Sequence, residues 1–166
     1  MTVTMSRCAS RLVILLGLAA GAFHAAPALA QAPKPIETSD GDTPGTRVEV
    51  TELKRGSGGV VSLKFQMIND SAKTISFGFD FGAADVGNAD FKTIGGITLV
   101  DPVAKKKYFV VRDTEKKCVC SSGLDDLPKG SRLNLWAKFP APPEDVNKIG
   151  ILIPHFAPMD DVPISK

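Results

Sequence analysis

A repeating alternation of apolar and polar residues constrains the fold of this chain more than any other feature. It is clearest over residues 61–67, where every second side chain is apolar and the intervening ones are polar. The apolar positions are Val61, Leu63, Phe65 and Met67. Because successive side chains of a β-strand point to opposite faces, this period of two predicts a half-buried strand.

A second segment with the same period follows directly. Ile75, Phe77, Phe79 and Phe81 fall on one face, and the intervening residues 69–73, NDSAK, favour a turn. We therefore expect residues 58–81 to form two neighbouring antiparallel strands that share one apolar face.

Further short strands are expected along the chain, whereas helical periodicity is weak and limited to a turn near residues 143–146. The expected strand ranges are 46–54, 92–100, 105–112, 117–120, 131–139 and 148–153. Many short strands in one domain favour an all-β fold, namely an antiparallel immunoglobulin-like β-sandwich of about 7–8 strands. A small β-barrel is the alternative architecture.

The first 30 residues have the pattern of a secretory signal peptide. Arg7 and Arg11 form a basic segment before an apolar run over residues 12–23. Ala28-Leu29-Ala30 matches a cleavage site. Residues 31–45 are polar and rich in proline, so we expect a flexible leader there and a β-sandwich domain over 46–166. The expected product is periplasmic or secreted and has no transmembrane span.

The charge balance does not favour a nucleic-acid partner. The chain has 20 basic and 18 acidic residues, and Arg7 and Arg11 of the signal segment account for the excess. Nucleic-acid binding usually requires a clustered basic face, so we expect none.

Residue types suited to catalysis are scarce after the signal segment. His155 is the one histidine of this portion, it lies between Pro154 and Pro158, and no nucleophile signature accompanies it. We expect an ordinary surface or packing histidine, no catalytic residues and a non-enzymatic protein.

Cys118 and Cys120 are the two cysteines that remain after the signal segment. In a straight strand the α-carbons of residues i and i+2 lie ~6.6 Å apart, which is near the upper limit for a disulfide. A bridge therefore requires the backbone to bend at Val119.

Several interpretations of this pair stay open. A structural disulfide would close a very small loop. The thiolates of Cys118 and Cys120 could instead bind Cu(I), with Met67 or Met159 adding a thioether ligand. A thiol-redox relay would be favoured by the adjacent Lys116 and Lys117, whose charge stabilises a thiolate. Free thiols or intermolecular pairing complete the alternatives.

Two features could mark an interaction surface. Trp136 falls on the more polar face of the strand expected at 131–139. Lys105, Lys106 and Lys107 form a short basic run that could face an anionic partner or protect a strand edge.

Two stretches of the sequence carry a family resemblance. They read YFVVRDTEKKCVCSSGL and LWAKFPAPPEDVNKIGILIPHFAPMDDVPIS. Over about residues 46–164 the chain resembles a family of small exported bacterial domains of uncharacterised function. The resemblance implies an immunoglobulin-like fold and an extracytoplasmic location, and it assigns no chemistry to any residue.

These observations lead to two functional hypotheses. The first is an exported, non-enzymatic binding or interaction module of the bacterial cell envelope, without cofactor, whose partner is an envelope protein or ligand. The alternative is a periplasmic Cu(I)-binding or thiol-redox protein that works through the Cys-x-Cys pair.

Overall fold

The computed structural model describes residues 34–78, 81–83 and 91–166. The predicted signal segment 1–30 and Phe79 lie outside these residues. Across the described ranges, no helical segment has the length and apolarity needed to cross a membrane.

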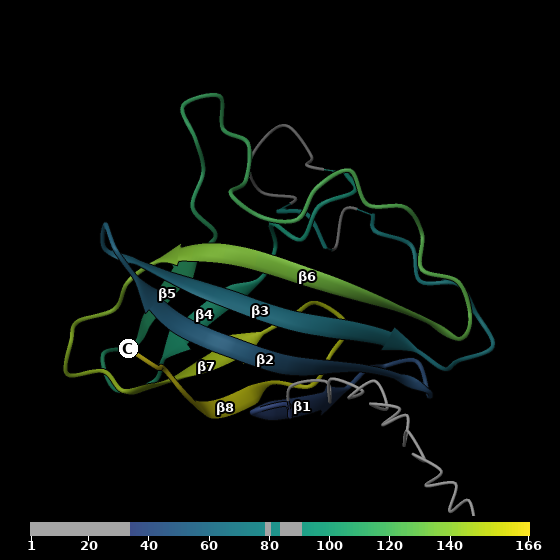
Figure 1. Cartoon of the computed structure of the whole chain (residues 1–166), viewed down its shortest axis with the longest axis horizontal. Coiled ribbons are helices and arrows are strands. Elements are labelled where there is room, and N and C mark those ends of the chain that lie inside the picture. Colours follow the sequence, from purple (N-terminus) through teal and green to yellow (C-terminus); the bar gives the residue numbers. More distant parts are fainter. Residues whose placement is uncertain (1–33, 79–80, 84–90) are drawn as a thin grey trace, which may run out of the picture. The chain divides into compact units, whose positions relative to one another are not determined.

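Eight strands in the described residues form two antiparallel sheets (Figure 1). The first sheet has the order β1-β2-β3-β6 and the second has the order β5-β4-β7-β8. The strands of the first sheet are β1 (Glu37–Asp40), β2 (Thr46–Gly56), β3 (Val60–Asn69) and β6 (Ser131–Pro140). Those of the second are β4 (Thr98–Asp101), β5 (Lys106–Phe109), β7 (Lys148–Leu152) and β8 (Met159–Pro163).

The inward faces of both sheets contribute to one apolar core, as expected of a β-sandwich. Phe65 and Leu63 of β3, Phe139 of β6 and Ile151 of β7 are fully buried members of this core. The period of two in residues 61–67 therefore predicts β3 correctly, because each apolar position of that segment is buried. Among the described strands the two sheets do not close on one another, so the barrel alternative is wrong.

The second alternating segment, by contrast, does not form the strand expected next to β3. Ile75 makes an isolated bridge with Leu127, while Phe77 and Phe81 are buried with their ring centroids 5.2 Å apart. The physical reason is that β3 already pairs with β2 on one edge and β6 on the other. Phe77 and Phe81 therefore enter the core from a loop.

The leader expected at 31–45 contains strand β1, which corrects both the leader and the domain boundary at residue 46. Residues 37–40 pair with residues 47–50 of β2. The Ser39 hydroxyl is buried and donates a hydrogen bond to the Ala157 carbonyl at 2.6 Å. Backbone pairing and this contact order a segment that has little apolar surface to bury.

The remaining strand predictions differ mainly in length. β2, β6 and β7 match their expected ranges closely. The range 92–100 overlaps only the short strand β4, which ends at Asp101, and the range 105–112 contains only the short strand β5. Residues 117–120 make isolated bridges in place of a strand, and β8 was not expected.

Candidate binding face

Cys118 and Cys120 form a disulfide within a short hairpin. Their α-carbons are 5.3 Å apart, closer than the ~6.6 Å of a straight strand. The backbone accordingly bends at Val119, as the spacing predicts. We refer to residues 111–121 as the cysteine hairpin.

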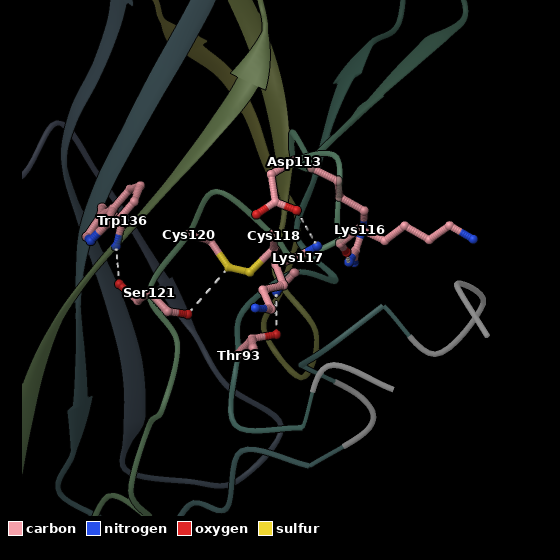
Figure 2. Close-up of a disulfide and its surroundings, with 10 residues drawn as sticks. Thr93, Asp113, Lys116, Lys117, Cys118, Cys120, Ser121 and Trp136 are labelled. Carbon is pink, nitrogen blue, oxygen red and sulfur yellow. Dashed lines mark hydrogen bonds between the residues drawn. A yellow bond between two sulfur atoms is a disulfide. The ribbon is translucent and has the colours of Figure 1, made fainter. Parts of the chain in front are cut away.

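The turn of the cysteine hairpin is held by its own polar groups. One carboxylate oxygen of Asp113 accepts hydrogen bonds from the backbone N–H groups of Glu115 and Lys117, both at 2.9 Å. The Lys117 ammonium pairs with the Glu115 carboxylate at 2.7 Å, and Lys116 extends away from the disulfide (Figure 2). The Lys117 charge predicted to stabilise a thiolate is therefore paired with an acid.

The cysteine hairpin covers the outer edge of β6. The Lys138 N–H donates to the Val119 carbonyl at 3.0 Å, and the Ser121 N–H donates to the Trp136 carbonyl at 2.9 Å. The Trp136 N–H in turn donates to the Ser121 hydroxyl at 3.0 Å (Figure 2). Both backbone polar groups of Trp136 are thus bonded to the hairpin, which positions the strand that carries its side chain.

Trp136 lies on the outward face of the first sheet, beside an open groove of about 460 Å³. Trp136 is 42% exposed. The groove crosses three strands, and its lining comprises Glu49, Thr51, Lys64, Phe65, Gln66, Asn134, Leu135 and Trp136. We call this feature the Trp136 groove.

The strand register places the polar residues of the Trp136 groove in two rows. Gln66 lies opposite Asn134, and Lys64 lies opposite Trp136. The Gln66 side-chain N–H donates to the Asn134 side-chain carbonyl at 2.9 Å. The groove therefore combines an indole with a paired amide platform on a rigid sheet.

The lysine run lies elsewhere. Lys106 and Lys107 belong to β5, an edge strand of the second sheet, and Lys105 lies in the preceding turn. Lys106, Lys107 and the exposed Phe109 line a different groove from that of Trp136. The structure thus does not combine the lysines and Trp136 into one surface.

The Cu(I) ligands considered from the sequence are not gathered into one place. Met159 is buried in β8, at the opposite edge of the second sheet from β5, the strand that leads into the cysteine hairpin. Met67 is buried in the core. The described residues contain no group of three or more histidine, cysteine, aspartate or glutamate side chains arranged for a metal ion.

His155 is exposed at the surface. This agrees with the expectation of an ordinary surface or packing histidine. Its Nδ1 lies 3.6 Å from an Asp42 carboxylate oxygen, and its ring centroid lies 5.4 Å from that of Phe81.

Sequence reasoning identified Trp136 but missed the residues that surround it. Gln66 and Asn134 are separated by 68 positions, and only the register between β3 and β6 places them side by side. The available signal was the polar alternation of each strand taken alone, which indicates an outward face without showing its neighbours.

Comparison of the chain with protein-family models, with curated proteins and with solved structures finds no match.

Proposed function

We propose that this protein is an exported, non-enzymatic binding module of the bacterial cell envelope, immunoglobulin-like in type, and that it binds its ligand at the Trp136 groove. The observation that carries this proposal is the placement of a half-exposed indole in an open groove on an otherwise hydrogen-bonded sheet face. Large aromatic side chains with a polar handle are enriched at recognition surfaces because they bury much area with few rotatable bonds.

The chemistry of the groove favours binding over catalysis. In its lining the Thr51 hydroxyl donates to the Lys64 carbonyl and the Glu49 carboxylate is paired with Arg47, whereas a nucleophilic mechanism needs a nucleophile oriented by a base. The predicted signal segment supports export, and the sandwich of two antiparallel sheets supports the immunoglobulin-like type.

Indole fluorescence tests the proposal, because Trp136 is the one tryptophan of the sequence. Purified protein is titrated with separated envelope fractions: cell-wall polysaccharide, lipid vesicles and extracted protein. We expect one fraction to shift the emission saturably, and Asn134→Ala to weaken that response. Phe109→Ala, which removes an exposed aromatic from the second sheet, is the control and should leave it unchanged. Sedimentation with a fraction that does not alter the emission would place binding outside the groove and contradict the proposal.

The thiol-redox alternative remains a second candidate because the disulfide includes the partly exposed Cys118. This candidate predicts thiol exchange with a small dithiol, or Cu(I) binding after reduction, and loss of both in Cys118→Ser/Cys120→Ser. An unchanged titration in that variant would remove the candidate.

A further inference from the structure

Both charged residues that line the Trp136 groove, Glu49 and Lys64, are paired within the protein. The Lys64 ammonium lies 3.0 Å from the Glu52 carboxylate, and the Arg47 guanidinium lies 3.1 Å from the carboxylates of Glu49 and Asp70. A charged ligand would have to compete with these ion pairs for its own partner. Within this lining, charge complementarity therefore favours an uncharged ligand; the exposed Arg132 and Lys138 share the outward face of β6 but do not line the groove.

The amide pair leaves hydrogen-bonding capacity for a ligand. The Gln66–Asn134 bond uses one amide N–H and one carbonyl. An amide group has a carbonyl oxygen and two N–H donors, so the Gln66 carbonyl and the Asn134 N–H groups retain capacity for further bonds. A ligand that presents both donors and acceptors, as a hydroxyl does, can use both.

The indole provides an apolar platform next to these polar groups. Trp136 and Asn134 are two residues apart on β6 and share its outward face, which corresponds to a spacing of ~6.6 Å along the strand. The groove extends over three neighbouring strands, about 10 Å from the first to the third. A sugar ring has a C–H face that can stack on an indole and equatorial hydroxyls that reach outward, and two linked rings span such a groove.

Strand addition by an extended peptide is disfavoured next to Trp136. The β6 edge is already bonded to Val119 and Ser121 of the cysteine hairpin. Peptides that bind sheets by augmentation require an unpaired edge to satisfy their backbone groups. On the open sheet face, the backbone of a peptide would meet side chains alone.

We infer that the Trp136 groove binds an uncharged oligosaccharide, with one sugar ring stacked on the indole and its neighbour bonded to the amide pair. This inference rests on the proposed function, because it names the ligand class of the same groove.

Calorimetric titration of the whole protein with defined tetrasaccharides tests the inference. The neutral probes are cellotetraose, chitotetraose, maltotetraose and mannotetraose, and tetragalacturonate is the anionic control. At least one neutral probe should bind saturably and more tightly than the anionic control. Trp136→Ala should weaken that binding by about tenfold or more, since truncation of a central aromatic removes most of its contact area.

Two further variants separate stacking from folding. Trp136→Phe keeps an aromatic face and should retain part of the affinity, whereas Phe109→Ala should remain within about twofold of the unmodified protein. Neutral-probe binding that is unchanged in Trp136→Ala would overturn the inference, as would preference for the anionic probe.

The two proposals fail in different ways. If an envelope fraction shifts the Trp136 emission through Asn134 while no neutral tetrasaccharide binds, the saccharide inference is overturned and the binding function stands. If neither the fractions nor the tetrasaccharides affect the groove, both are overturned.

Discussion

Trp136 and Phe109 are both exposed aromatic residues next to lysines, yet their surroundings differ. Trp136 of β6 lies opposite Lys64 of β3. Both backbone polar groups of Trp136 bond to the cysteine hairpin. Phe109 ends the edge strand β5, close in sequence to Lys106 and Lys107, and is more exposed, at 61% against 42%.

The difference lies in what surrounds each aromatic ring. The face around Trp136 is built from strands that are paired on both sides and carries ion pairs and an amide pair in register. The lysines beside Phe109 are suited to protect a strand edge from unwanted pairing. This difference supports placing the proposed binding site at Trp136, where neighbouring strands hold the aromatic ring among polar groups, and not at Phe109.

The largest expected effect comes from Asn69, whose buried side chain supports the loops at the end of β3. Asn69 at the end of β3 is fully buried; its amide donates to the carbonyls of Lys73 and Leu127, both at 2.8 Å, and its carbonyl accepts from Ser71. Asn69→Ala should lower the free energy of unfolding by about 2–3 kcal/mol, because buried polar groups lose their partners. Denaturant titration measures this.

Asn134→Ala is the matched control for that variant. Asn134 is exposed on the same sheet, so its truncation should change the free energy of unfolding by about 0.5 kcal/mol or less. Equal effects of the two variants would contradict the assignment of Asn69 as a support.

A smaller effect is expected from the disulfide. Cys118→Ser/Cys120→Ser should lower stability by about 1–2 kcal/mol, the entropy of closing so short a loop. The Trp136 and Lys138 amides, which bond to the hairpin, should exchange hydrogen faster, since the cover of the β6 edge is loosened. The backbone of β6 at Trp136 would then be exposed in the same way as the backbone of the edge strand β5.

Hydrogen exchange followed by mass spectrometry or NMR checks this prediction. The Ala137 amide, which points to β3 by the alternation of the ladder, is the internal reference. Ser122→Ala, which removes an exposed hydroxyl just past the hairpin, should change nothing. Unaltered exchange at Trp136 and Lys138 in the double variant would show that the disulfide does not hold the cover.

The smallest effect concerns β5 and arises only at alkaline pH. Burial raises the pKa of Tyr108 above its ordinary value of 10.0, and the nearby Asp101 carboxylate raises it further, partly offset by Arg55. The folded state then favours the neutral phenol, so this contribution is complete below pH 10.0 and is lost as the pH rises through the raised pKa.

Tyr108→Phe should therefore flatten the alkaline decline in stability and leave stability at neutral pH nearly unchanged. Among the described residues the Tyr108 hydroxyl has no hydrogen-bond partner, so its removal breaks no bond. Denaturant titrations at several pH values above and below 10.0 measure the difference. A parallel decline in both proteins would contradict the prediction.

The sequence predicts those parts of the fold in which one strand face is buried and the other exposed. The alternation in residues 61–67 and 131–139 locates β3 and β6, because burial and strand period agree there. It fails for Phe77 and Phe81, since buried aromatics can also enter a core from a loop. It misses β1, whose order comes from backbone pairing and a serine contact rather than from apolar burial.

The candidate site was only partly predictable for a related reason. The bend at Val119 follows from the local spacing of Cys118 and Cys120, and the polar face of Trp136 follows from alternation. The contact of Gln66 with Asn134 depends on which strands pair and in which register. Local sequence does not contain that information.

The residue pairs that complete the first sheet are distant along the chain. Ser165 bonds the Leu53 carbonyl across 112 positions. The pairing of β3 with β6 spans β4 and β5 of the second sheet, which lie between them along the chain. Such non-local pairing slows folding, because loop closure must precede the contacts that stabilise it. We therefore expect this chain to stay unfolded for longer after synthesis, which is the state in which a protein carrying the predicted signal segment would be threaded across a membrane.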